Sequence, residues 1–275
     1  MSLTTLLVYV GADEADSQRI RLAAALADRF DAVLTGMSVE TLPPPIVIDG
    51  TVVDGEQLQA QIKDLRARLD ERGNRFRSVA AGERRKLEWR QRIDFPADAL
   101  AVEGRGADLI VIGQEVGYGG FYRALDAGSA ILKAGRPVLM VPRKVSSLRA
   151  EHVVVAWKDT REARRAVYDA LPLLRKAARV LVVELSETTE EKGTAEEAVT
   201  EVVRYLDRHR VKADSLVQVL ERGTGAKQLI GLAQNEGADL IVAGAYGHSR
   251  LGEWIFGGMT RGLLAESPMC CLFSH

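Results

Sequence analysis

Short apolar runs alternate with amphipathic stretches along the whole chain. Runs without polar interruptions are typical of strands buried on both faces of a sheet. The run 6–10 is one of these, and in the first half we predict strands at residues 6–10, 32–37, 86–90, 106–113 and 137–141. Apolar residues at three-to-four spacing between them, such as Leu58, Ile62, Leu65 and Leu69, predict helices. Strands that alternate with helices in this way predict a parallel sheet covered by helices on both faces.

One octapeptide occurs twice in the chain. Residues 106–113 (GADLIVIG) recur as residues 237–244 (GADLIVAG), with seven of eight positions identical. Identity at this level indicates an internal duplication. The second copy has predicted strands at 153–157, 179–185, 216–220, 237–244 and 270–273. We therefore predict two domains, residues 1–143 and 151–275, with a short junction.

The two copies differ in length. The offset between equivalent residues falls from 147 at the first strand to 131 at the fourth, so the first copy carries 16 extra residues. The segment 42–55 is rich in proline and glycine, which cannot continue a helix. We predict that the insertion lies there. In the second copy, Pro172 is expected to kink or end the first helix.

Ligands of open parallel sheets bind beyond the carboxyl ends of the strands, where the strand order reverses. That rule points to the loops after the first and fourth strands. In the second copy, the loop after the fourth strand contains Gly244 and Gly247, and Gly257 and Gly258 open the last helix. Glycines let the backbone approach a ligand, and a helix N-terminus suits phosphate. Glycines that only form turns are an equally good interpretation of the spacing.

These glycines resemble the universal stress protein family, which has G-x2-G-x9-G-[ST] after its fourth strand. The chain has Gly244-x2-Gly247-x9-Gly257, with Gly258 where the family has Ser or Thr. The ending 267–272 (SPMCCL) is similar to the family's Ala-Pro-x-Pro-Val-Leu, and 153–163 is similar to its first strand and following helix. The resemblance implies two tandem doubly wound α/β domains. Each has a five-stranded parallel sheet in the order 3-2-1-4-5, and the two pair through their final strands with pseudo-two-fold symmetry.

Nucleotide-binding members of the family hold ATP phosphates with this turn, so the resemblance implies an ATP-type site in the second half. The implied binding residues are Ala156, Trp157, Lys158, Gly244, Gly247, His248, Gly257, Gly258, Met259 and Thr260. Lys158 stands where the family has an Asp that contacts the nucleoside, which exchanges a hydrogen-bond acceptor for a cation. Gly258 lacks the family's hydroxyl, which lowers affinity about tenfold. Thr260 is near enough in sequence to compensate.

The first half departs further from the pattern. When the final strands are matched, its loop is two residues shorter, and Ala124 and Leu125 take the places of the later glycines. Gly128-Ser129 then falls inside the helix, although Gly113 is kept and Asp13 fits the family's Asp. We therefore predict at most one degenerate site per chain, and a structural role for the first half.

Composition narrows the protein class. Apolar residues make up 47% and charged residues 27%, which is usual for a globular protein. The net charge is −1, so the chain has no overall positive potential that would attract nucleic acid or anionic membranes. The charged stretch 56–77 is read as a solvated helix face. The adjacent Cys270 and Cys271 cannot form a disulfide framework and are read as small core residues. With no leader pattern at the N-terminus, the expected location is cytoplasmic.

Three functions remain open. The first is a non-enzymatic stress-response protein. The second is a slow ATPase or adenylating enzyme, for which Glu253 is the available acid. The third is a binding module for another anionic or apolar small molecule, and the cation of Lys158 favours an anion.

No metal-ligand spacing, G-x-S-x-G or GK[ST] phosphate loop is present. For Trp254 we favour packing of the loop onto the sheet over contact with a bound base. His275 is expected to have no fixed position. A homodimer or an unknown protein partner is compatible with the sequence.

Overall fold

The computed structural model describes residues 2–13, 15–42, 47–48, 51–52, 55–82, 86–114, 124–221, 225–247 and 258–275. The main elements of the first half are β1 (Thr5–Tyr9), α1 (Asp16–Phe30), β2 (Val33–Glu40), α2 (Gly55–Ala80), β5 (Leu87–Ile93), α3 (Pro96–Glu103), β6 (Leu109–Gly113), α4 (Ala127–Ala134) and β7 (Val138–Val141). Those of the second half are β8 (His152–Trp157), α5 (Arg161–Leu174), β9 (Arg179–Ser186), α6 (Lys192–Arg208), β10 (Ala213–Val219), α7 (Gly225–Asn235), β11 (Leu240–Gly244), α8 (Gly258–Glu266) and β12 (Cys270–Ser274). The helix α5 continues two residues beyond Pro172 before it ends.

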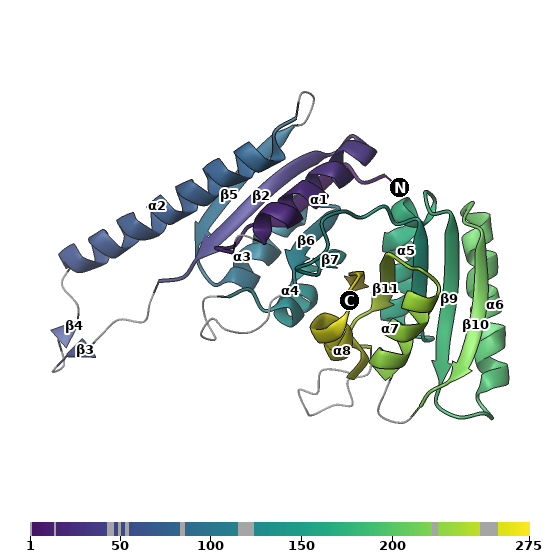
Figure 1. Cartoon of the computed structure of the whole chain (residues 1–275). Helices are drawn as coiled ribbons and strands as arrows, with labels where there is room; N and C mark the ends of the chain where they lie inside the picture. The colour runs from purple at the N-terminus through teal and green to yellow at the C-terminus, as the bar shows by residue number, and fades with distance from the viewer. Residues whose placement is uncertain are drawn as a thin grey trace.

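A single ten-stranded sheet runs through both halves, in the order β10-β9-β8-β11-β12-β7-β6-β1-β2-β5 (Figure 1). When only the strands of this sheet are counted, each half has the strand order 3-2-1-4-5, and all its strand pairs within a half are parallel. The final strands β12 and β7 pair antiparallel, with Leu272 opposite Leu139. The predicted fold class and the pairing of the halves through their last strands are therefore confirmed.

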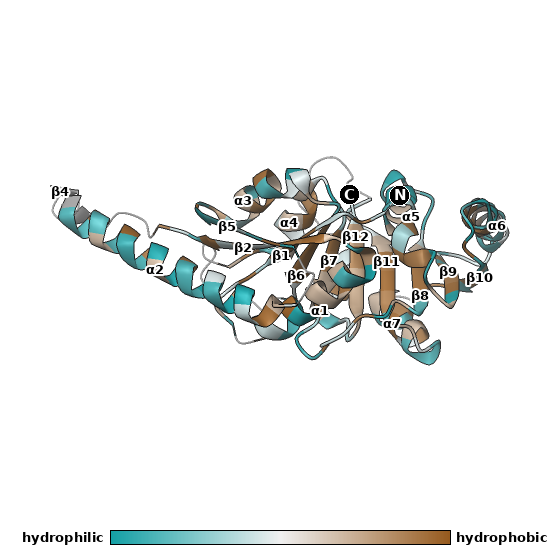
Figure 2. Ribbon diagram, turned by 90° about the horizontal axis from the view of Figure 1, so that it is seen from above, coloured by the Kyte–Doolittle hydropathy of each residue, from teal (hydrophilic) through white to brown (hydrophobic). Residues whose placement is uncertain are grey.

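Helices cover both faces of the sheet, and each face has its own apolar core (Figure 2). The helices α1, α2, α5 and α6 pack on one face, and α3, α4, α7 and α8 pack on the other. Adjacent strand residues point to opposite faces, so Cys270 and Cys271 lie in different cores. Both thiols are buried and free, as predicted. None of the described helices is both long and apolar enough to cross a membrane.

The aspartate of the repeated octapeptide ties the fourth strand of each half to the start of the first strand. Asp108 Oδ2 accepts hydrogen bonds from the amides of Thr4 at 2.7 Å and Thr5 at 3.0 Å. Asp239 accepts from the amides of Glu151 at 3.4 Å and His152 at 3.3 Å. The same residue is therefore needed in both copies for a structural reason.

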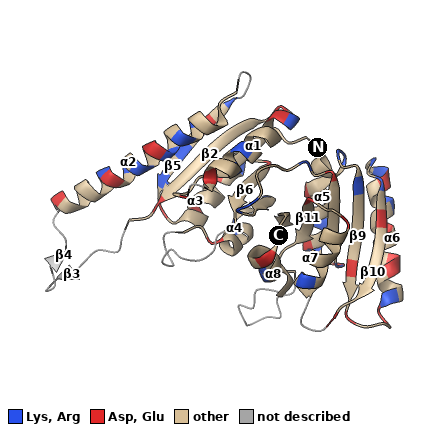
Figure 3. Ribbon diagram, viewed as in Figure 1, with Lys and Arg blue, Asp and Glu red and all other residues tan. Residues whose placement is uncertain are grey.

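The extra length of the first half lies partly in a helix. The helix α2 has 26 residues and its counterpart α6 has 17. The rest includes the short antiparallel pair β3 (Val47–Ile48) and β4 (Thr51–Val52), inside the predicted insertion. The first turns of α2 extend beyond the sheet, and charges of both signs alternate along this helix (Figures 1 and 3). The insertion is thus longer than the segment 42–55 predicted from proline and glycine content.

Candidate functional site

A cavity of about 620 Å³ lies at the carboxyl ends of β8, β9 and β11. This volume is within the range of small-molecule sites. Eight of the ten residues assigned by resemblance line it: Ala156, Trp157, Lys158, Gly244, Gly247, Gly258, Met259 and Thr260. His248 and Gly257 lie outside the described residues, as do Trp254 and Glu253. The two loops named from the sequence, far apart in the chain, therefore meet at one cavity.

Part of the cavity wall was missed by the sequence analysis. Val183 and Leu185 at the end of β9, together with Leu229 of α7, add apolar surface. The strand β9 lies beside β8 in the sheet, so its carboxyl end borders the same crevice. The strand order implied by the resemblance was the signal that would have found these residues.

Two glycines of the loop are explained by packing. A Cβ at Gly244 would lie 2.5 Å from the backbone nitrogen of Ala163 and 2.6 Å from the carbonyl carbon of Glu162. A Cβ at Gly247 would lie 2.9 Å from Glu162 Oε2. Gly244 is thus required by the close approach of the backbone of α5, whereas a Cβ at Gly247 would have to displace the side chain of Glu162. A Cβ at Gly258, the first residue of α8, would meet no atom of the described residues within 4 Å.

Lys158 forms an ion pair with Glu187, another residue of the cavity wall. Its Nζ lies 2.6 Å from Glu187 Oε1, and both side chains are about half exposed. The carbonyl of Lys158 accepts a hydrogen bond from Thr160 N at 2.6 Å, which turns the chain into α5. The cation that replaces the family's Asp is therefore held at the cavity mouth by an exposed ion pair.

Tyr246, between the two packed glycines, has a left-handed backbone with φ 61°. Its amide donates to Thr260 Oγ1 at 3.5 Å, and this buried hydroxyl therefore helps to hold the loop. Burial and the nearby Asp126 of the first half raise the pKa of Tyr246 to about 12. Non-glycine residues in this region are strained and cluster at functional sites. Sequence reasoning passed over Tyr246.

The C-terminal residue is attached to the same loop. His275 Nδ1 lies 3.0 Å from the carbonyl oxygen of Ala245, and its ring meets that of Tyr246 edge-on at 6.3 Å. The interpretation that His275 has no fixed position is therefore wrong. The loop after β11 is closed by the end of the chain, because β12 runs beside β11 and its carboxyl end emerges there.

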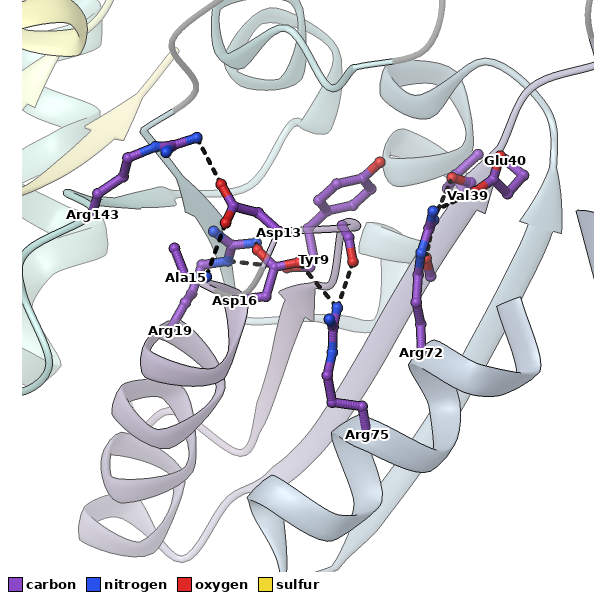
Figure 4. A network of polar contacts seen from close by, with 12 residues as sticks. Tyr9, Asp13, Ala15, Asp16, Arg19, Val39, Glu40, Arg72, Arg75 and Arg143 are labelled. Atoms are coloured by element: carbon purple, nitrogen blue, oxygen red, sulfur yellow. Dashed lines mark hydrogen bonds and ion pairs between the residues drawn. The ribbon is translucent and has the colours of Figure 1, made fainter. Parts of the chain in front are cut away.

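The corresponding cavity of the first half, about 530 Å³, contains a network of ion pairs (Figure 4). Arg19 Nε donates to the carbonyl of Tyr9 at 3.0 Å, and its guanidinium pairs with Asp16. The guanidinium also lies directly against Gly113, in the direction of the missing Cβ. Gly113 and Gly244 are equivalent residues of the two halves. Gly244 lies against the backbone of α5, whereas Gly113 lies against the side chain of Arg19.

Arginines of α2 complete this network. Arg75 Nη2 donates to the carbonyl of Gly11 at 2.7 Å and lies 3.5 Å from Asp16 Oδ2. Arg72 pairs with Glu40. The charged face of α2 is therefore not simply solvated, and that interpretation is wrong for these residues. Burial raises the pKa of Asp16, although Arg19 and Arg75 oppose the shift.

Two further carboxylates of the first half have partners at the positions that correspond to the candidate site. Asp13 Oδ2 lies 2.7 Å from Arg143 Nη2 of the junction. Asp126 caps α4, where its carboxylate accepts from Ser129 N at 2.6 Å. Gly128 and Ser129 lie inside α4, as predicted. The N-terminus of α4 thus already faces a carboxylate.

Residues 149–273 match the model of the universal stress protein family. The second half of the chain belongs to the universal stress protein family. No curated protein sequence matches the chain. The agreement with the family covers all the described residues of the candidate cavity, since each lies between residues 149 and 273.

Solved structures resemble the whole chain. A universal stress protein from Archaeoglobus fulgidus DSM 4304 is 15% identical, with 99% of this chain and 96% of that chain covered and a TM-score of 0.72. A putative universal stress protein from Pseudomonas aeruginosa UCBPP-PA14 is 14% identical, with 99% and 93% covered and a TM-score of 0.60. A functionally unknown protein from Pseudomonas aeruginosa PAO1 is 16% identical, with 99% and 92% covered and a TM-score of 0.59. These likenesses extend the fold to the first half.

Proposed function

We propose that the protein is a non-enzymatic stress-response protein whose second half binds an ATP-type nucleotide. The observation that carries the proposal is the convergence of Lys158, Gly247 and Gly258, from separate loops, on one cavity. Family membership of this half supports the same reading.

The cavity offers different surfaces to the two ends of a nucleotide. Val183, Leu185 and Leu229 supply apolar wall for a base, and α8 begins at Gly258 on the cavity surface. The amides of a first helical turn have no partner within the helix and favour phosphate. A triphosphate would therefore lie toward α8.

Lys158 is available to exchange its partner. Exposed ion pairs contribute little stability, and the pair with Glu187 is exposed on both sides. A phosphate at the cavity mouth would compete with Glu187 for the ammonium group. The cation would then assist phosphate binding in place of the family's contact with the nucleoside.

A thermal-shift titration with ATP and ADP tests the proposal, because a ligand that binds only the folded state raises the melting temperature. We expect a saturable rise with both nucleotides. Gly258→Trp should abolish the rise without loss of basal stability, because a Cβ at this position meets no atom of the described residues within 4 Å. Gly193→Trp, at an exposed position of α6 with no atom within 4 Å, is the matched control and should keep the rise. No shift at millimolar nucleotide would refute nucleotide binding.

Phosphate release separates the non-enzymatic proposal from a slow ATPase. We expect purified protein to release no phosphate from ATP above background. Release that disappears in Gly258→Trp and persists in Gly193→Trp would make the protein an enzyme. Native mass spectrometry of the protein as purified adds an independent check, since a retained mass of ATP or ADP supports the proposed ligand class.

A further inference from the structure

Glu187 directly follows β9 at the wall of the candidate nucleotide cavity. The residue lines the cavity, and its side chain is 61% exposed. Val183 and Leu185 precede it at alternate positions of the chain and line the same cavity. Side chains at alternate strand positions share one face of a sheet. Glu187 therefore continues the row of β9 side chains that forms the cavity wall, with its carboxylate open to solvent. No role was assigned to it from the sequence.

A short turn fixes the backbone of Glu187. Its amide donates to Glu191 Oε2 at 3.3 Å, and the amide of Glu191 donates to Thr188 Oγ1 at 3.3 Å. Glu191 is the N-cap residue of α6, so this turn is held between β9 and α6. The ion pair with Lys158, which directly follows β8, brings the carboxylate toward the end of that neighbouring strand. The carboxylate thus lies where β8 and β9 end.

The strand order places this carboxylate between the two regions proposed for the ends of the nucleotide. The apolar wall for a base is formed at β9 and α7, and the phosphate region lies at the start of α8, which follows β11. The strand β8 lies between β9 and β11. The two regions are therefore about two strand spacings apart, or about 10 Å. A ribose that joins the base to the phosphates would lie over the ends of β8 and β9, beside Glu187.

The chemistry of a carboxylate suits this position. A carboxylate accepts several hydrogen bonds, so it can take hydroxyl donors as well as an ammonium group. In other doubly wound nucleotide-binding domains, an Asp or Glu holds the 2′-hydroxyl of the ribose in this way. Among the described residues that line the cavity, the only carboxylates are those of Glu187 and Glu266. Glu266 belongs to the last turn of α8, so Glu187 is the one at a strand end.

We propose that Glu187 is a specificity-determining residue, which selects nucleotides with free ribose hydroxyls by accepting hydrogen bonds from them. The inference rests on the proposed function, because it concerns the same cavity. When a phosphate draws Lys158 away from the ion pair, the ribose hydroxyls donate to the carboxylate in place of the ammonium group. A site that hydrogen-bonds a ligand hydroxyl rejects an analogue without it, because its polar group then loses a partner.

Calorimetric titration of the whole chain with ATP and with 2′,3′-dideoxy-ATP tests this role. We expect the wild type to bind ATP at least about tenfold more tightly, since the acceptor of the lost hydrogen bonds is charged. Glu187→Ala should bring the ratio of the two affinities close to one. Glu187→Gln keeps one acceptor oxygen and should give an intermediate ratio. Glu190→Ala is the matched control, because it removes the same charge from an exposed position of the same turn that does not line the cavity, and it should keep the wild-type ratio.

The ratio separates contact with the hydroxyls from the general effect of charge. Removal of either acidic residue changes the repulsion of the phosphates, which both nucleotides share, and this effect cancels in the ratio. Equal affinity of the wild type for the two nucleotides, or a preference that persists in Glu187→Ala, would overturn the role of Glu187 and leave nucleotide binding in place. A preference that is lost equally in Glu190→Ala would also overturn it. Binding of neither nucleotide by the wild type would overturn the proposed function together with this inference.

Discussion

Gln114, one residue beyond β6 in the first half, donates from its side-chain amide to the carbonyl oxygen of Leu264 in α8, 3.0 Å away. The same amide lies 3.4 Å from the carbonyl oxygen of Ser267. Leu264 lies in the last turn of α8, where backbone acceptors lack partners within the helix, and Ser267 directly follows that turn. The first half therefore caps the helix whose other end opens the candidate nucleotide cavity.

We expect Gln114→Ala to lower the free energy of unfolding by about 0.5–1.5 kcal/mol, the usual contribution of a hydrogen bond. Chemical denaturation of the whole chain measures the change. Gln234→Ala, at an exposed position of α7, is the control and should change stability by less. Equal effects of the two substitutions would show that the contact across the halves contributes nothing.

Gly244 and Gly258 belong to the same sequence motif but should respond differently to alanine. A Cβ at Gly244 collides with the backbone of α5, which cannot move aside as a side chain can. We expect Gly244→Ala to lower the free energy of unfolding by about 1–3 kcal/mol. The Cβ of Gly258→Ala meets no atom of the described residues within 4 Å, so this substitution should be neutral or slightly stabilising. The melting temperatures of the two variants measure this difference. A similar decrease in melting temperature in both would contradict the explanation that Gly244 is required by packing against α5.

Gly258→Ser restores the family's hydroxyl next to the proposed phosphates. One neutral hydrogen bond corresponds to about a tenfold gain in affinity, and no atom of the described residues lies within 4 Å of a Cβ at this position. Calorimetric titration with ATP measures the gain. Gly258→Ala is the control, since it adds the methylene without the hydroxyl. If serine and alanine give the same affinity, the phosphates do not lie at the start of α8.

Much of the fold could be predicted because the signals are local and repeated. The apolar runs predict where strands occur, and the octapeptide that ends at Gly113 and Gly244 indicates that the two halves are copies of one domain. The pairing of the final strands β7 and β12 was predicted from the family resemblance alone. Nothing within the sequence itself distinguishes a final strand that pairs from one that lies at a free edge.

The parts of the site that escaped prediction depend on contacts between distant segments. Arg19 and Arg75 meet at Asp16 although 56 positions separate the two arginines, and each looks like an ordinary helix-surface charge. Tyr246 gives no signal because a left-handed backbone at a non-glycine residue is set by its neighbours. The cavity residue Val183 reads only as a strand residue. Periodicity identifies elements, whereas the pairing of charges across them is decided by packing.

The network around Asp16 should behave as a unit. Arg19→Met leaves the buried carboxylate with Arg75 alone, and removal of one partner from a buried pair costs about 3–5 kcal/mol. We expect a loss of this order in chemical denaturation. The double variant Asp16→Asn/Arg19→Met removes the unpaired charge and should recover part of the loss. A double variant that loses the sum of the two single losses would show that the residues act independently.

The acid dependence of stability should depend on Asp108. Burial alone would raise the pKa of this carboxyl, but hydrogen bonds from Thr4 and Thr5 outweigh it and hold the pKa below its usual value. The unfolded chain then binds the proton more tightly than the folded one. Stability from this group is therefore complete above the unfolded pKa of about 3.9 and is lost as the pH falls through the lower folded pKa.

We expect Asp108→Asn to reduce stability at neutral pH and to flatten the decline of stability on acidification, measured by denaturation from neutral to acid pH. Asp239→Asn is the internal comparison, because the bonds accepted by Asp239 are 3.3 Å and 3.4 Å long, against 2.7 Å and 3.0 Å for the amide bonds of Asp108. Its effect should be the smaller of the two. A slope in Asp108→Asn that equals the wild-type slope would show that these hydrogen bonds do not set the pKa of the carboxyl, because only an ionising group linked to folding can change the slope.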